Sequence, residues 1–282
     1  MNRFFKIGAV MIRMSIPDEL TPPPHFLLFE TDEGDCDYEY EIRIGSAIVP
    51  PSIDATALRE DFAVYSDNVY ETRLLGARGR EGYYGRYEEV APDRAVITLD
   101  PAYSDLFSQD TVFSSLFALE RRALAFEELV LHCAYIDYDD TAILFSAPSG
   151  VGKSTQASLW ERYRGAVTKN GDRSLISIND GECIASGWPV CGSSEICSNS
   201  SHRIKAIVML SQSPQNNVTT LEPMQAFPKI YSQITINSWN RSAAEKAITL
   251  IEKLINTVPV YHLSCNISQD AVDTLHSAIY GD

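Results

Sequence analysis

The chain has 282 residues and 45% of them are hydrophobic, so it can bury the core of one large domain or two modest ones. It carries 38 acidic and 23 basic residues, a formal net charge of -15. A surface this acidic repels phosphate backbones and anionic lipid, which disfavours nucleic acid and membranes as partners. No apolar run approaches the ~20 residues of a spanning helix, and the six cysteines show no paired spacing. We therefore expect a soluble cytoplasmic protein with reduced thiols.

The first part of the chain alternates short β-like runs with turns. Residues 1–12 are mildly apolar and predict a first β-strand, because no small-residue cleavage site follows them. Residues 38–44, 69–75 and 94–99 alternate large apolar with charged side chains, which suits an antiparallel sheet that is wet on one face. We predict a β-rich N-terminal region over residues 1–108.

From about Asp110 onward the pattern changes to helices alternating with strands. Residues 114–131 repeat apolar side chains at helical spacing and predict a helix. The other predicted elements are a buried strand at 141–145, a helix at 154–164 stopped by Gly165, a hairpin of 174–178 and 183–185 around Asn179-Asp180-Gly181, a strand at 204–210, two helices between 224 and 256, a strand at 260–265, and a helix at 269–280 capped by Ser268. The hairpin favours a mixed sheet, so we predict a mixed α/β domain over residues 109–282.

A phosphate-binding loop, or Walker A motif, stands between the predicted strand at 141–145 and the predicted helix at 154–164. Its sequence is Ala147-Pro148-Ser149-Gly150-Val151-Gly152-Lys153-Ser154, followed by Thr155. Two glycines let the backbone turn so that successive N–H groups face a phosphate, and the helix start adds a positive dipole end. Lys153 supplies a cation for the β- and γ-phosphates, and the Ser154 hydroxyl suits a Mg²⁺ position. This order of elements predicts nucleotide binding with magnesium.

The motif and its surroundings resemble the HPr kinase/phosphorylase family, whose P-loop kinase fold is shared with phosphoenolpyruvate carboxykinases. Residues 149–154 look like the loop of that family, and His132 lies at the family's distance upstream of the P-loop lysine. Residues 165–173 occupy the place of the family's Asp-Asp segment. The resemblance implies a kinase domain with a mixed sheet of the HPr kinase type. It does not cover the first ~100 residues, which would then serve acceptor recognition.

Residues 145–150, 170–173 and 188–194 look more specifically like a divergent bacterial branch of that family. Some relatives in this branch phosphorylate serine on peptides that are natural-product precursors. Two positions depart from the family pattern: Gly171 replaces the first Asp of the pair, and Pro148 replaces an acidic residue in the loop. Both changes remove carboxylates, so we predict forward kinase chemistry with weak or absent phosphorylase activity.

The resemblance assigns candidate roles, each of which has a plain structural alternative. Asp172 is the candidate base for an acceptor hydroxyl and a Mg²⁺ ligand together with Ser154, or else a turn aspartate. His132 stabilises the transferring group or orients Asp172, or is a core histidine.

Three further features are candidate acceptor or phosphate contacts. Arg173 clamps phosphate oxygens or is a surface arginine. The acceptor-facing loop is Cys191-Gly192-Ser193-Ser194, or this is an ordinary turn. Arg203 and Lys205 supply charge near the γ-phosphate or are solvated edge charges.

Three functions remain open from the sequence. The first is a kinase that uses ATP or pyrophosphate to phosphorylate a hydroxyl of a peptide, a protein serine or a small molecule. The second is a non-catalytic, nucleotide-gated binding protein whose N-terminal region recognises a partner. A GTPase ranks last. The segment Thr168-Lys169-Asn170-Gly171-Asp172 resembles a guanine-specificity motif, but its Asp stands one place too far along, and no persuasive Asp-x-x-Gly switch follows the P-loop. The acceptor, the base of the nucleotide and homo-oligomerisation stay undetermined.

Overall fold

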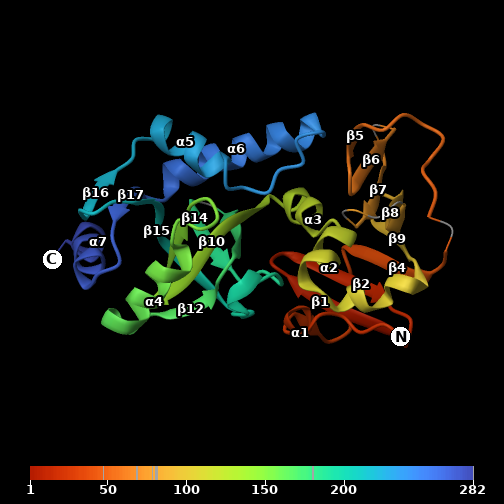
Figure 1. The fold of residues 1–282 in the computed structure, drawn as a ribbon, viewed down its shortest axis with the longest axis horizontal. Coiled ribbons are helices and arrows are strands. Elements are labelled where there is room, and N and C mark those ends of the chain that lie inside the picture. The colour runs from red at the N-terminus through yellow and green to blue at the C-terminus, as the bar shows by residue number, and fades with distance from the viewer. Residues whose placement is uncertain (47, 68, 78, 80–81, 180, 282) are drawn as a thin grey trace. The chain divides into compact units, whose positions relative to one another are not determined.

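The computed structural model divides the chain into two compact units, Met1–Arg122 and Ala123–Asp282 (Figure 1). It describes residues 1–46, 48–67, 69–77, 79, 82–179 and 181–281. Asp180, in the predicted hairpin turn, lies outside the described residues. The division follows Arg122, inside helix α3 (Leu119–Ala125). The functional division at residues 108 and 109 stays a prediction.

The N-terminal unit is built on a nine-stranded sheet in the order β3-β1-β2-β4-β9-β8-β7-β6-β5. The prediction of an antiparallel sheet is wrong in part, because β4 pairs in parallel with both β2 and β9. The predicted first strand is a hairpin instead, since Gly8 adopts φ +58 between β1 and β2. The strands are β1 (Asn2–Ile7), β2 (Val10–Ser15), β3 (Glu30–Thr31), β4 (Tyr38–Ile44), β5 (Ala57–Arg59), β6 (Phe62–Ser66), β7 (Glu71–Gly76), β8 (Tyr83–Ala91) and β9 (Arg94–Leu99).

Strand β4 follows the predicted alternation of apolar and charged residues. Tyr38, Tyr40 and Ile42 are buried, whereas the charged residues between them are partly exposed. Alternation with period two places one face of a strand against the core and the other toward water. Short helical turns complete this unit: α1 (Pro24–Leu27), η1 (Pro101–Ser108) and α2 (Asp110–Leu116).

The single helix predicted over residues 114–131 is wrong. The chain forms α2 and α3, interrupted at Ala118 with φ +49, and then turns at Glu127 with φ +63 into strand β10 (Glu128–Tyr138). A short apolar run that is buried on both faces satisfies helical and strand spacing equally, so periodicity cannot separate them. His132 therefore lies within a strand.

The C-terminal unit is built on an eight-stranded mixed sheet in the order β11-β10-β13-β14-β15-β17-β16, with β12 beside β10 and a further pairing between β11 and β15. The mixed sheet is confirmed: β15 pairs in parallel with β11 and β17, while β10 and the β13–β14 hairpin pair antiparallel. The extra β11–β15 pairing closes five strands into a ring. The strands after β10 are β11 (Thr141–Ser146), β12 (Val167–Asn170), β13 (Arg173–Asn179), β14 (Glu182–Ser186), β15 (Ser201–Gln212), β16 (Asn217–Thr220) and β17 (Val260–Cys265).

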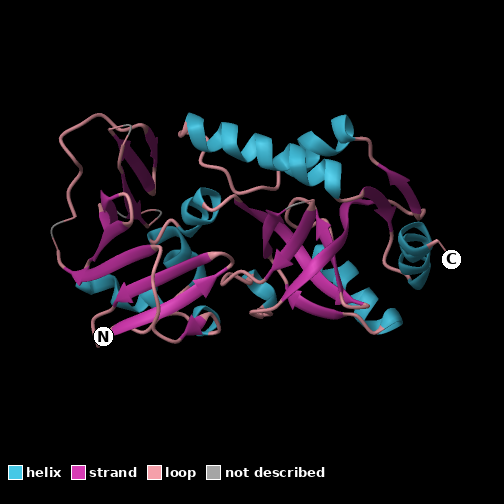
Figure 2. Ribbon diagram, turned by 180° about the vertical axis from the view of Figure 1, so that it is seen from behind, coloured by secondary structure: helices cyan, strands magenta, loops and turns pink. Residues whose placement is uncertain are grey.

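Helices pack on the two faces of this sheet (Figure 2). One core contains Leu131, Leu144 and Ile207 together with apolar residues of α5 (Pro223–Tyr231) and α6 (Arg241–Thr257). A second core contains Trp160 from α4 (Lys153–Arg164) and apolar residues of α7 (Gln269–Tyr280). Trp160 is fully buried, as expected of a core contact. A last short turn is η2 (Gly192–Ser194).

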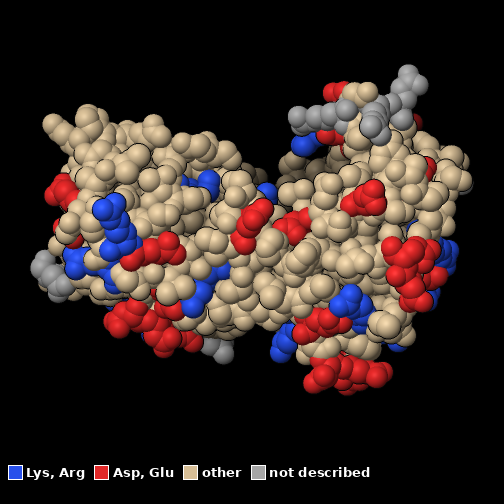
Figure 3. All heavy atoms as spheres, turned by 60° about the horizontal axis from the view of Figure 1, so that its bottom comes forward, with Lys and Arg blue, Asp and Glu red and all other residues tan. Residues whose placement is uncertain are grey.

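Uncharged residues form most of the face drawn in Figure 3, and separate groups of Asp and Glu stand on it with Lys and Arg nearby. This agrees with an acidic chain that still carries local basic positions. Across the part of the chain that the structure describes, no helix combines the length and the apolar character needed to cross a bilayer.

Candidate nucleotide and phosphoryl-transfer site

The P-loop connects the end of β11 to the start of α4. Gly150 and Gly152 adopt φ +82 and +123, in the region that favours glycine. A Cβ at Gly150 would meet no atom within 4 Å, so the backbone conformation and not crowding requires glycine there. Helix α4 follows directly and ends at Gly165, whose φ of +71 gives the expected left-handed cap.

Lys153 is the first residue of α4 and is only 8% exposed. Its Nζ donates a hydrogen bond to Ala147 O at 3.0 Å. Among the described residues, no carboxylate lies within ion-pair distance of this ammonium group. Burial lowers the pKa of Lys153, and the negative charge of Asp172 opposes that shift. A buried cation with a single carbonyl partner is suited to an anionic ligand.

The next two residues extend the loop into the first turn of α4. Ser154 is exposed and Thr155 is half-buried. Because they are the second and third residues of α4, both hydroxyl groups stand near the helix N-terminus. Groups that bind phosphate and magnesium commonly lie at such a position.

Asp172 lies in the tight connection between β12 and β13. The fully buried Asn170 fixes this connection: its Oδ1 accepts hydrogen bonds from the backbone N–H groups of Asp172 and Arg173, each at 3.0 Å. Its Nδ2 donates to Trp188 O at 2.7 Å. Asn170 is a positioning residue that the sequence analysis did not single out, although asparagine before glycine is a turn signal.

The Asp172 carboxylate contacts two of the predicted site residues. Its Oδ1 lies 3.5 Å from His132 Nε2, and its Oδ2 accepts a hydrogen bond from Arg173 Nε at 3.2 Å. The hydrogen bond with His132 lowers the pKa of Asp172 against the opposing effect of burial, and the charge of Arg173 lowers it further. Asp172 is thus an ionised carboxylate near neutral pH, as a base or metal ligand must be.

The segment after α5 holds both partners of Asp172. Gln233 O accepts a hydrogen bond from His132 N at 2.9 Å, and Gln233 Oε1 lies 3.2 Å from His132 Nδ1. Arg173 Nη1 donates to Thr235 Oγ1 at 2.8 Å. Gln233 and Thr235 carry no local sequence signal, so only the fold reveals them.

The Cys191–Ser194 loop lies directly against the connection between β12 and β13 that carries Asp172. Gly192 has φ +59, and a Cβ there would lie 3.0 Å from Asp172 Cγ. A Cβ at Gly171 would lie 1.9 Å from Ser194 Oγ, which itself donates to Cys191 O at 2.7 Å. Hence Gly171 has no room for a side chain while Ser194 keeps its place. This crowding is a physical reason for glycine at the position where the Asp-Asp pattern has its first aspartate. Ser193 is exposed.

The structure brings some predicted residues together and leaves others apart. His132, Arg173 and Gly192 contact Asp172, which interacts electrostatically with Lys153. Cys133, which the sequence analysis missed, interacts electrostatically with Asp172 and Lys153, and burial raises the pKa of its thiol.

The two cationic residues on β15 are occupied elsewhere. Arg203 is exposed and lies 3.4 Å from Glu182, and exposed Lys205 lies over the Tyr280 ring at 5.1 Å. Both side chains are solvated, but β15 is paired on both sides, so they are not edge charges.

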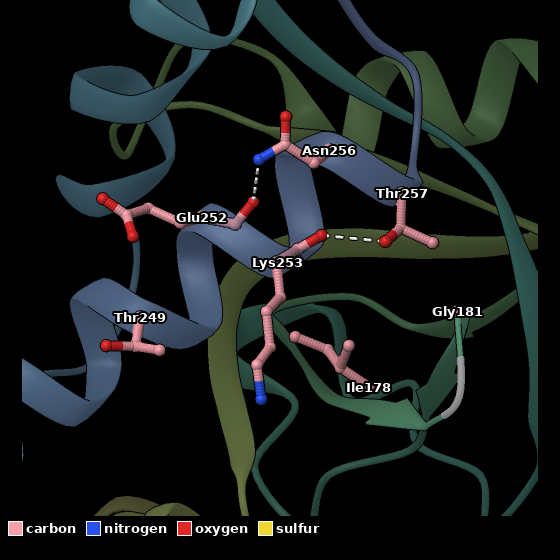
Figure 4. Close-up of a pocket in the computed structure, with 7 residues that line it drawn as sticks. All are labelled: Ile178, Gly181, Thr249, Glu252, Lys253, Asn256 and Thr257. Carbon is pink, nitrogen blue, oxygen red and sulfur yellow. Dashed lines mark hydrogen bonds between the residues drawn. The ribbon is translucent and has the colours of Figure 1, made fainter.

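A cavity of about 490 Å³ lies between α6 and the β13–β14 hairpin (Figure 4). Two of the α6 side chains drawn there bond back to their own helix: Asn256 Nδ2 donates to Glu252 O, and Thr257 Oγ1 donates to Lys253 O. No P-loop residue lines this cavity.

The model of the family described as SynChlorMet cassette protein ScmC matches residues 99–279, well over half of the chain. The chain belongs to the ScmC family. The family region contains the whole P-loop, Asp172 and the Cys191–Ser194 loop. The search of curated proteins found no match to the chain.

Among solved structures, the Hpr(Ser) kinase/phosphatase from Coxiella burnetii is similar at 12% sequence identity. The match covers 54% of this chain and 93% of that chain, with a TM-score of 0.31.

Proposed function

We propose that this protein is an HPr kinase-like phosphotransferase that moves the γ-phosphoryl group of ATP to a hydroxyl group of a peptide, a protein serine or a small molecule. One observation carries the proposal: an ionised Asp172, held by His132 and Arg173, stands within electrostatic reach of the P-loop cation Lys153. Phosphoryl transfer needs this combination of a phosphate-binding cation and a base for the acceptor.

The residues present fit a polyphosphate and magnesium. The buried ammonium of Lys153 has one carbonyl partner and gains from an anionic oxygen. The Ser154 hydroxyl and the Asp172 carboxylate are the hard oxygen ligands that Mg²⁺ prefers. When bound, the ion neutralises charge on the phosphate oxygens. The loop from Ser149 to Thr155 would hold the phosphates through its backbone N–H groups.

In the proposed reaction the acceptor oxygen forms a bond to the γ-phosphorus while the bond from that phosphorus to the β,γ-bridging oxygen breaks. ADP leaves, and Asp172 takes the proton of the acceptor hydroxyl. His132 and Arg173 position the two carboxylate oxygens of Asp172. Gly171 leaves the site one carboxylate short of the HPr kinase pattern, so we expect weak or absent phosphorylase activity.

The acceptor would approach along the Cys191–Ser194 loop, because Gly192 packs against the Asp172 carboxylate with no side chain of its own. Small residues allow a substrate backbone to come close. The N-terminal unit would add acceptor recognition.

The test uses γ-labelled ATP, Mg²⁺ and an extract of the host cell, with labelled products separated into peptide, protein and metabolite fractions. Asp172→Asn should lower transfer by about 10²- to 10⁴-fold, the usual contribution of a general base, while ATP binding persists. Asp140→Asn is the matched control, because the side chain of Asp140 is fully exposed. Equal labelling by wild type and Asp172→Asn would contradict the proposal.

The same experiment addresses the alternative of a non-catalytic, nucleotide-gated binding protein. That function predicts tight binding of Mg·ATP by the wild type and no Asp172-dependent product in any fraction. Lys153→Ala should abolish nucleotide binding under either function.

A further inference from the structure

A side chain from outside the P-loop tethers two of its carbonyl groups. Gln212 is the last residue of β15, the strand that pairs in parallel with β11. Because parallel neighbours end at the same edge of a sheet, Gln212 meets the loop that follows β11. Gln212 Nε2 donates to Val151 O at 3.2 Å and to Gly150 O at 3.4 Å. An amide nitrogen carries two hydrogens, so one side chain can serve both carbonyl groups.

The direction of these two carbonyl groups determines where the next two N–H groups point. Every peptide bond among the described residues is trans, and in a trans peptide unit the C=O and N–H groups point in opposite directions. The carbonyl of Gly150 is turned toward Gln212, so the N–H of Val151 points the other way. The carbonyl of Val151 directs the N–H of Gly152 in the same manner. Successive N–H groups on one side of a loop form a concave surface that binds anions.

The N–H of Val151 retains capacity for a ligand, since its contact with Pro148 O is long at 3.4 Å. The loop would have other conformations without the tether. Glycine adopts positive and negative φ at similar cost, so the peptide unit between Val151 and Gly152 can rotate as a whole. That rotation would turn the Gly152 N–H away from a bound phosphate. Gln212 opposes the rotation, because its amide would lose an acceptor.

We propose that Gln212 is a positioning residue of the phosphate site, which raises the affinity for a polyphosphate through the P-loop backbone. The inference rests on the proposed function, because the N–H groups that Gln212 directs are those that would hold the phosphates. A binding group that is already ordered in its bound conformation costs less free energy to engage. The effect must therefore extend to every ligand with the phosphate chain, with or without a nucleoside.

The test is calorimetric titration of the full chain with Mg·ATP and with Mg·tripolyphosphate, a phosphate chain without a nucleoside. Gln212→Leu removes the donor and keeps a side chain of similar size at an exposed position. We expect this variant to lose about three- to tenfold in affinity for both ligands, by the same factor, as for the loss of a hydrogen bond. Gln215→Leu is the matched control, because Gln215 is exposed on the segment after β15, and its affinities should equal those of wild type.

Two further measurements separate positioning from a loss of stability. The midpoint of urea unfolding should be the same for Gln212→Leu and wild type. In NMR spectra of ¹⁵N-labelled protein, the Gly152 amide signal should shift less on addition of Mg·tripolyphosphate in Gln212→Leu than in wild type.

Equal affinities of Gln212→Leu and wild type for both ligands would overturn the inference and leave the proposed function intact. A loss for Mg·ATP without a loss for Mg·tripolyphosphate would also overturn it, because Gln212 would then act on the nucleoside. Failure of wild type to bind either ligand would overturn the proposed function and the inference with it.

Discussion

Two clusters of charged side chains, one in each unit, pair carboxylates with arginines at different depths. In the N-terminal unit, Glu71, Arg73 and Glu89 are 1%, 2% and 8% exposed. Arg73 Nε donates to Glu71 Oε1 at 2.6 Å, and Arg121 Nε donates to Glu89 Oε1 at 2.7 Å. In the C-terminal unit, the Asp172 side chain is 26% exposed and its partner Arg173 is 35% exposed.

The difference in depth indicates a difference in role. In the N-terminal cluster the Glu89 carboxylate accepts hydrogen bonds from neighbouring side chains of the same unit, since Tyr87 and Arg122 also donate to it. Charges buried this way must stay paired for the unit to fold. The C-terminal cluster keeps oxygen atoms at a solvent-accessible position, near a buried lysine that has no carboxylate partner in the described part of the chain. An incomplete, half-exposed cluster is the one that a ligand can complete.

The largest effect should come from opening the buried cluster with Glu89→Ala. Loss of this carboxylate leaves Arg121 and Arg122 without their partner, and we expect unfolding free energy to fall by about 3–5 kcal/mol. Urea unfolding followed by far-UV circular dichroism measures it. Glu88→Ala on the same strand is the control, because its pair with Arg86 is partly exposed and should cost at most about 1 kcal/mol. Similar losses for the two variants would refute the distinction.

Gly171→Ala tests how closely the Cys191–Ser194 loop is packed onto the site. The new Cβ would lie 1.9 Å from Ser194 Oγ, so we expect a loss of about 1–3 kcal/mol. Tryptophan fluorescence reports this unit, since Trp160, Trp188 and Trp239 all belong to it. Adding Ser194→Gly should restore most of the loss, and no recovery in the double variant would show that Ser194 is not the obstacle.

Gly192→Ala separates backbone strain from contact with Asp172. Its φ of +59 makes any side chain cost about 1 kcal/mol, and its Cβ would press on the Asp172 carboxylate at 3.0 Å. Gly165→Ala is the matched control, with φ +71 and nothing within 4 Å. We expect similar stability losses for both variants but reduced phosphoryl transfer for Gly192→Ala alone. Equal transfer rates would remove this loop from the acceptor path.

The smallest effect should be the dependence of stability on pH at Asp172. Its pKa is lowered in the folded state, mainly by His132, so the carboxylate stabilises the protein above its unfolded pKa. That contribution is lost as pH falls through the lower, folded pKa. The stability difference between wild type and Asp172→Asn, about 1 kcal/mol or less for a partly exposed pair, should therefore shrink with acidification. A difference that stays constant into the acidic range would count against an ionised Asp172.

Local chemistry let the sequence by itself determine the P-loop, its strand and helix, the Gly165 cap and the β13–β14 hairpin. Each depends on residues within one turn of each other, such as Gly150, Gly152 and Lys153. The prediction of one helix over residues 114–131 was wrong, because apolar residues buried on two faces do not distinguish a helix from a strand. The parallel neighbours of β4 were missed because pairing partners lie far apart along the chain.

Only the tertiary structure decided what surrounds Asp172. His132, Gly192 and Thr235 come from a strand, a short turn and a loop that are distant in sequence, and packing alone brings them within reach of Asp172 and Arg173. Sequence specifies local conformation through propensity and turn chemistry, but a site built from distant side chains is specified by how the sheet and helices pack.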